Sequence, residues 1–304
     1  MKKQHLADLV LLSIAFIWGS TFVIVQRAIE FIPPNFFNGI RFLIGSLCLS
    51  LLLIGQKKDS LFNGALMKNG ILLGTFLFCG YSFQTVGLML TTSSKAGFIT
   101  GLNVMIVPFL ASLILKEKLR ATSIFCAIIG TIGLYLLAGG SFHSFQTGDF
   151  LVLLCAFAFA VHIVLTGALS KQFPVLPLTI IQLLTVSLLS FLSAMAFEPT
   201  IFTISIRRLF TFDVAFALLM TSLLATAYAY VAQTKYQAFT SPSRVAMIFA
   251  TEPVFAAITA FFWQGERLSA TSAIGCLFIF IAMILSEAFK DPFSRWKKSK
   301  SEAA

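Results

Sequence analysis

The segments YSFQT at residues 81–85 and YVAQT at residues 230–234 place Tyr, Gln and Thr at the same spacing, 149 positions apart. The same offset aligns EKL at residues 117–119 with ERL at residues 266–268. Composition alone does not produce a self-match of this kind, which indicates an internal repeat.

The earlier parts of the two halves align at an offset of 141, where Asp8 falls on Asp149. The change in offset fits an eight-residue insertion near the middle of the second half. We therefore divide the 304-residue chain into a first repeat at residues 1–145, a second repeat at residues 146–289 and a basic tail at residues 290–304.

The composition indicates that the chain lies in a membrane. Hydrophobic residues make up 58% of it, the mean hydropathy is +0.92, and only 11% of residues are charged, whereas soluble domains have about 25%. A helix needs about 20 apolar residues to cross the hydrocarbon. Ten stretches approach this length: 6–25, 36–54, 70–90, 96–115, 122–138, 150–169, 178–197, 214–232, 245–263 and 270–285. The predicted fold is therefore an all-α membrane protein with ten transmembrane helices.

The repeat and the charges predict how these helices cross the membrane. Each copy contains five spans, an odd number, so the second copy enters the bilayer in the opposite sense, as in many secondary transporters. With the N-terminus inside, 16 of the 22 Lys and Arg residues fall on the cytoplasmic side, which follows the positive-inside rule. We expect both termini to be cytoplasmic, in the cell membrane, and nucleic-acid binding is excluded as the use of the net charge of +10.

Arg41 and Glu252 are the charged residues that lie well inside the predicted spans. An ionisable group at that depth is costly unless it faces a cavity or a partner. Glu252 lies eight residues beyond Arg244, about 12 Å along a helix, and is the candidate for proton coupling; the other interpretation is a protonated side chain bonded to a neighbouring helix. Arg41 is either a cavity charge or an anchor that reaches the outer headgroups.

Other polar or aromatic residues within the spans are candidates for a substrate cavity. A single one of them could instead join two helices by a hydrogen bond, and Trp18 either packs in the core or forms part of the cavity wall. Together with Arg41 and Glu252, the set comprises Trp18, Thr21, Asn38, Tyr81, Gln84, Asn103, His162, Gln182 and Gln233.

Glycine and proline predict local features of the helices. The GxxxG spacing of Gly70 and Gly74 predicts close helix packing. Pro108 and Pro253 each remove a backbone donor, so we expect helix breaks there.

No catalytic signature is found in the sequence, and no metal, cofactor or ATP site is expected. Transport would therefore depend on gradients, either by proton coupling or by exchange. A channel or a lipid-acting membrane protein is the alternative; His162 with Ser187 or Ser193 is the candidate base and nucleophile for the latter.

The motifs in both halves resemble the EamA family of the drug/metabolite transporter superfamily. The resemblance rests on WGSTF at residues 18–22, IPP at 32–34, KAGFITGL at 95–102, EPV at 252–254 and GERL at 265–268. It implies ten helices with cytoplasmic termini, a central cavity between the halves and transport of amino acids, other metabolites or drugs. It also makes Glu252 the match to the family's ninth-helix glutamate.

We therefore expect a secondary transporter that moves small metabolites, amino acids or related compounds first, by alternating access and in the direction of export. The expected partners are a small-molecule substrate and the lipid bilayer, with a homodimer left open. The substrate, the coupling ion and the transport direction are not determined by the sequence.

Overall fold

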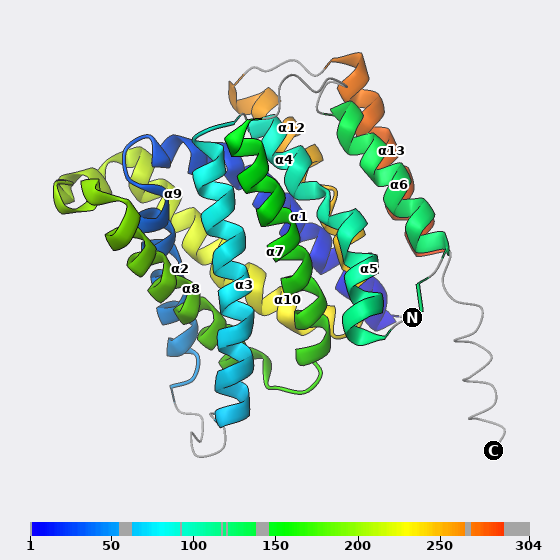
Figure 1. Cartoon of the computed structure of the whole chain (residues 1–304), viewed down its shortest axis with the longest axis horizontal. Helices are drawn as coiled ribbons and strands as arrows, with labels where there is room; N and C mark the ends of the chain where they lie inside the picture. Colours follow the sequence, from blue (N-terminus) through cyan, green and yellow to red (C-terminus); the bar gives the residue numbers. More distant parts are fainter. Residues whose placement is uncertain are drawn as a thin grey trace.

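A computed structural model describes residues 2–54, 63–91, 93–116, 118–119, 121–137, 146–264 and 269–288. Every regular element in these ranges is helical (Figure 1). The turn at residues 265–268 and the predicted tail at residues 290–304 lie outside the described residues.

The helices divide between the two halves of the chain. The first half contains α1 (Lys2–Ile29), α2 (Pro34–Leu51), α3 (Gly64–Leu88), α4 (Ser93–Gly101), α5 (Asn103–Leu115) and α6 (Ala121–Leu137). The second contains α7 (Thr147–Leu169), α8 (Val175–Phe197), α9 (Phe212–Ser222), the π-helical segment η3 (Leu223–Tyr228), α10 (Ala229–Gln237), α11 (Pro242–Phe249), α12 (Glu252–Gln264) and α13 (Ala270–Ala288). Two short 3₁₀ turns, η1 (Pro199–Phe202) and η2 (Ile206–Phe210), lie between α8 and α9.

Six helical stretches among the described residues are long and apolar enough to cross a membrane: 3–29, 64–88, 96–115, 147–169, 175–197 and 212–237. Helices α6 and α13 are apolar but shorter. Large apolar side chains point away from the protein interior, as Phe197 is 80% exposed and Leu113 is 77% exposed. Side chains of this kind have no polar atom that lipid would leave unsatisfied. The chain is thus an all-helical, multi-pass membrane protein, and the count of ten spans stays a prediction.

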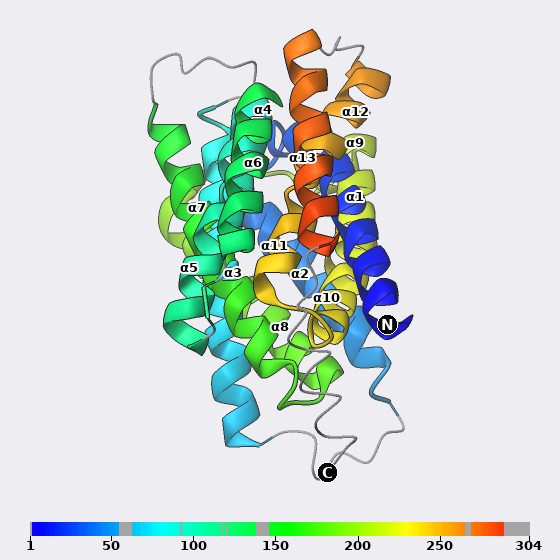
Figure 2. The same cartoon turned by 90° about the vertical axis from the view of Figure 1, so that its right-hand side faces the viewer.

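Helices at equivalent positions in the two halves run in opposite directions where they pack together. Figure 2 shows α6 beside α13. Gly130 of α6 faces Ala282 of α13, while at the other end the Leu137 carbonyl accepts a hydrogen bond from Ser272. Helices α2 and α8 form a second such pair, since Asn35 contacts Glu198 and Ser187 donates to the Gly39 carbonyl.

Two helical stretches at matching repeat positions are interrupted near their middle. The first is divided at Leu102, between α4 and α5, and the second at residues 250–251, between α11 and α12. Asn103 begins α5 and Glu252 begins α12, and these residues are repeat mates at the offset of 149. Interrupted helices at corresponding positions of two halves are a strong indicator of a transporter's binding site.

Pro253 lies at the second position of α12. An amide in the first turn of a helix has no partner within that helix, so the missing donor of Pro253 costs no helical hydrogen bond. The predicted break at Pro108 is wrong, because α5 continues through this residue. Pro108 removes only the bond to the Val104 carbonyl, a loss that surrounding helices tolerate in membrane proteins. The break that does occur in this half, at Leu102, has no proline to mark it.

The GxxxG pair on α3 confirms the predicted close packing. A side chain added at Gly70 would lie 2.6 Å from Ile181 on α8. One added at Gly74 would lie 2.5 Å from the Thr185 side chain and 2.6 Å from the Gln182 carbonyl oxygen. The absence of side chains at these glycines therefore allows α3 and α8 to approach closely.

We expect Gly74→Ala to lower the free energy of unfolding by about 1–3 kcal/mol, the usual cost of overpacking. The added methyl group would meet the backbone of α8, which cannot move aside as a flexible side chain can. Thermal unfolding of the purified protein in detergent measures the effect. Gly64→Ala is the control, because a side chain there meets no described residue within 4 Å; equal stability of the two variants would contradict this account.

Candidate functional site

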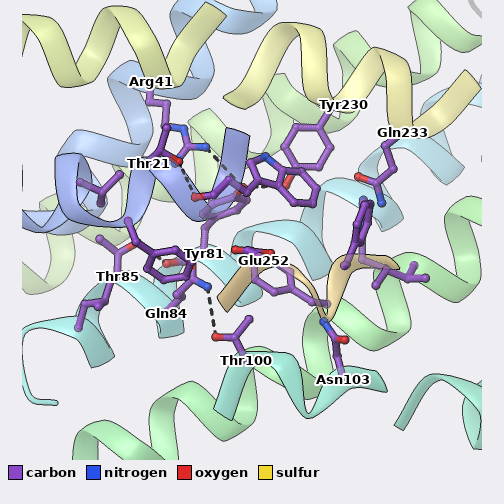
Figure 3. A pocket seen from close by; sticks show the side chains of 18 residues that line it. Thr21, Arg41, Tyr81, Gln84, Thr85, Thr100, Asn103, Tyr230, Gln233 and Glu252 are labelled. Carbon is purple, nitrogen blue, oxygen red and sulfur yellow. Dashed lines mark hydrogen bonds between the residues drawn. The ribbon is translucent and has the colours of Figure 1, made fainter. Parts of the chain in front are cut away.

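A cavity of about 60 Å³ lies where the two halves meet (Figure 3). Its volume is enough for a few water molecules. Its wall combines residues from both halves, including both interrupted stretches. The sequence-predicted residues that line it are Trp18, Thr21, Arg41, Tyr81, Gln84, Asn103, His162, Gln233 and Glu252.

Two predicted residues, Asn38 and Gln182, do not line the cavity but are fully buried behind its wall. The Asn38 amide donates to the Thr85 hydroxyl at 3.0 Å. The Gln182 side-chain oxygen lies 3.0 Å from Nε2 of His162, and its amide nitrogen donates to Thr234 at 3.4 Å. These residues therefore hold lining residues in position instead of facing the cavity.

Arg41 is buried at the cavity wall, with a relative exposure of 3%, and its guanidinium is held by the opposite half. Its Nε donates to the Thr226 hydroxyl at 2.8 Å, and one terminal nitrogen donates to the Ala225 carbonyl at 3.3 Å. The same guanidinium lies 4.8 Å from the centroid of the Tyr81 ring, within the range of a cation–π contact. Of the two predicted roles of Arg41, the geometry matches the cavity charge.

The partners of Arg41 lie on the π-helical segment η3, which the sequence analysis did not predict. A π-helix shifts the backbone bonding pattern and often marks a functional site. Here it presents the Ala225 carbonyl and the Thr226 hydroxyl to the site. The sequence did carry one signal, because the repeat mate of Thr226 is the apolar Leu77, so the second half has a polar group where the first has none.

Trp18 both packs in the core and lines the cavity. Its indole nitrogen donates to the Ala225 carbonyl at 2.8 Å, so this carbonyl accepts from Trp18 and Arg41 together. The indole ring also lies 5.0 Å from the Phe249 ring and 5.5 Å from the Tyr230 ring. Trp18 thereby joins α1 to η3, α10 and α11 around the site.

Tyr81 and Tyr230 meet at the centre of the site. The Tyr230 hydroxyl donates to the Tyr81 hydroxyl at 2.9 Å, and the two residues are repeat mates. Equivalent residues of two related copies contact each other only on the axis that relates the copies. This hydrogen bond therefore marks the pseudo-two-fold axis, and the cavity lies beside it.

Glu252 faces the cavity without a bonded partner. Among the described residues, no hydrogen bond or ion pair reaches its carboxylate. Glu252 and Arg41 line the same cavity but do not form a contact ion pair. Because Glu252 is the first residue of α12, the helix dipole favours its negative charge.

The side-chain oxygens of Asn103 and Gln233 are also unsatisfied within the part of the chain that the structure describes. Asn103 is 7% exposed and Gln233 is 1% exposed. A buried polar atom without a partner is costly, so both oxygens can accept a hydrogen bond from a bound molecule.

A bidentate ion pair joins the two halves on the side of the cavity where α1 and α11 begin. Arg244 donates to the Asp8 carboxylate through Nε at 2.9 Å and through a terminal nitrogen at 2.6 Å. The two side chains are 9% and 14% exposed. The sequence analysis aligned Asp8 with Asp149 but did not predict the pairing of Asp8 with Arg244.

The candidate catalytic pair of the lipid-acting alternative does not form. Nε2 of His162 lies within hydrogen-bonding distance of Gln182 and Thr166, and Ser187 donates to the Gly39 carbonyl on another helix. In the described structure, neither Ser187 nor Ser193 forms a hydrogen bond with His162.

The sequence matches the model of the EamA-like transporter family twice, at residues 5–139 and 146–287. An uncharacterized transporter from Archaeoglobus fulgidus is 33% identical over 283 residues, which are 93% of this chain and 86% of that protein. The uncharacterized transporter YoaV from Bacillus subtilis is 23% identical, over 88% of this chain and 92% of its own length. A crystal structure with 18% sequence identity has the same fold, with a TM-score of 0.76 over 92% of this chain and 95% of that one.

We expect Thr226→Val to destabilise the protein by about 1.5–3 kcal/mol, because it removes the acceptor of a charged hydrogen bond from Arg41. Thr221→Val is the matched control on the preceding turns of α9, where the hydroxyl bonds only to the Ala217 carbonyl of its own helix. Chemical denaturation of both variants in detergent measures the difference. If the two substitutions cost the same, the Arg41–Thr226 bond does not contribute as described.

Proposed function

Because the chain belongs to the EamA-like transporter family, we propose that it is a secondary transporter that exports small metabolites, amino acids and related compounds first among them. The observation that supports this most directly is a cavity at the meeting point of two interrupted helical stretches, one from each half, with Arg41 and Glu252 in its wall. Binding sites of secondary transporters form at such places.

We propose ten membrane spans, with α4–α5, α9–η3–α10 and α11–α12 each counted as one. The antiparallel packing of α6 with α13 and of α2 with α8 supports two inverted five-helix repeats, 1–145 and 146–289. The excess of Lys and Arg on one side supports cytoplasmic termini.

The pseudo-two-fold relation supports a proposal of alternating access. A chain with two inverted halves can open to either side by exchanging the conformations of those halves. In the described conformation the halves differ: Val25 and Leu88 line the cavity, whereas at their mates Thr166 contacts His162 and Gln237 donates to the Ile163 carbonyl. The Asp8–Arg244 ion pair joins the two halves on the side that the charge distribution places toward the cytoplasm.

Glu252 is the proposed proton carrier. It is an ionisable group at mid-span, it faces the cavity, and no described residue neutralises it through a contact ion pair. Its repeat mate Asn103 cannot carry a proton, so coupling would depend on one half alone.

If Glu252 carries the proton, Glu252→Gln should abolish uptake driven by a pH gradient in proteoliposomes while solute exchange continues. Glutamine keeps the size and polarity of the side chain but cannot release a proton. Glu30→Gln is the control, because Glu30 is exposed and pairs with Arg27 on the surface. Unchanged pH-driven uptake by Glu252→Gln would rule out this role.

Both termini should be cytoplasmic. In a variant without the five native cysteines, single cysteines placed at Lys3 and at Ala304 should react with an impermeant maleimide only after cell lysis. A cysteine at Arg207, between α8 and α9, should react in intact cells. Labelling of the two termini on opposite sides would contradict the inverted repeat.

The transporter itself is tested by counterflow. Proteoliposomes loaded with a metabolite extract should accumulate labelled amino acids from outside in a saturable manner, and mass spectrometry identifies which solutes exchange. A steady single-channel current in planar bilayers would instead show the alternative channel function.

A further inference from the structure

The cavity offers hydrogen-bond acceptors and donors in different places. In the view of Figure 3, Asn103 and Gln233 lie on one side of Glu252, and Arg41 lies on the other. Asn103 and Gln233 each contribute a side-chain oxygen without a hydrogen-bond partner among the described residues, Glu252 contributes a carboxylate, and Arg41 contributes a guanidinium. The cavity is therefore polarised, with acceptors concentrated at the starts of α5 and α12 and on α10.

Donor groups of the described residues do not satisfy these acceptors. The amide nitrogen of Gln233 donates to Gln237 at 3.2 Å, and the amide nitrogen of Gln84 donates to Thr100 at 3.3 Å. The Trp18 indole and the Tyr230 hydroxyl donate to other partners as described above. The donors therefore come from water or from a bound compound.

We propose that Glu252, Asn103 and Gln233 form a subsite for the primary ammonium group of the transported compound. This inference rests on the proposed function and narrows its substrate class. An –NH₃⁺ group has three donors and a positive charge, which match two amide oxygens and one carboxylate. Charge-assisted hydrogen bonds are stronger than hydrogen bonds between neutral groups, so they can offset the cost of burying the ammonium group.

Other ligands match the three acceptors less well. A quaternary ammonium has no N–H donor, and a carboxylate would be repelled by Glu252. A hard metal ion needs about six oxygen ligands, more than the two amide oxygens and two carboxylate oxygens of these residues. A carboxylate on the same compound as the ammonium would instead be directed toward Arg41.

The test uses the purified full-length protein in detergent and three probes that differ only at the nitrogen position: L-alanine, its N,N,N-trimethyl derivative and propionate. We expect L-alanine to raise the thermal unfolding midpoint, and the other two to leave it unchanged. A response to propionate or to the trimethyl derivative equal to that of alanine, or no response to alanine, overturns the proposal. If sodium chloride stabilises the protein more than choline chloride does and alanine has no effect, the subsite binds a metal ion. This result also overturns the proposal.

Variants test the individual oxygens. Asn103→Leu and Gln233→Leu should each weaken alanine binding about tenfold or more, as expected for a lost hydrogen bond to a charged group. Asn103→Asp and Gln233→Glu retain an acceptor oxygen and should retain binding, which guards against a leucine variant that fails to fold. Asn69→Leu is the control, because it makes the same exchange on α3 away from the cavity, where the Asn69 amide donates to the Ala65 carbonyl and to no other described residue. Wild-type affinity in both leucine variants contradicts the subsite.

A failure of the subsite proposal can be distinguished from a failure of the proposed transport function. If counterflow of metabolites persists but the probes show no preference for a primary ammonium, the subsite is wrong and the transporter stands. If the wild-type protein shows no counterflow at all, the transport proposal fails instead.

Discussion

Polar groups inside a bilayer need partners from the protein, because no bulk water is present to supply them. Arg41 shows how this constraint organises the structure. Satisfying its guanidinium takes Thr226, the Ala225 carbonyl and Tyr81, and the first two are available in this geometry because η3 is a π-helix. The same carbonyl positions Trp18. One buried charge on α2 thus depends on a local irregularity in the opposite half, and the wall of the cavity depends on both.

The two halves share a backbone plan but differ in chemistry at the site. The starts of α5 and α12 are repeat mates, yet one carries an amide and the other a carboxylate, Asn103 and Glu252. Arg41 and Gln182 form a second unequal pair, and only Arg41 lines the cavity. Because the copies are parts of one chain, each could change its side chains separately while the helix packing stayed paired. The result is a symmetric framework around a cavity with a distinct acceptor side and donor side.

Much of this framework could be predicted from the repeat. The offsets of 141 and 149 match the helix bounds of the two halves, and Pro253 lies at the interruption before α12. The interruption at Leu102 could not be predicted, since no proline marks it and local sequence favours a continuous helix. The π-segment η3 was missed for a similar reason, because Arg41 and Trp18, which donate hydrogen bonds to it, are far away in sequence. The prediction of a helix break at Pro108 was wrong because surrounding helices keep α5 intact. The sequence identified polar residues within spans but could not tell Asn38 and Gln182, which support the wall, from those that face the cavity.

The contact between Tyr81 and Tyr230 imposes a choice that the fold cannot avoid. Two equivalent hydroxyls that bond to each other cannot play identical roles, since a single proton lies between their oxygens and belongs to one of them. In the described conformation Tyr230 gives the proton and Tyr81 receives it, with Arg41 also directed at Tyr81. Exact equivalence of the halves is therefore impossible at the very point where they are most alike. Reversing that one bond would exchange the parts played by the two tyrosines without displacing either ring.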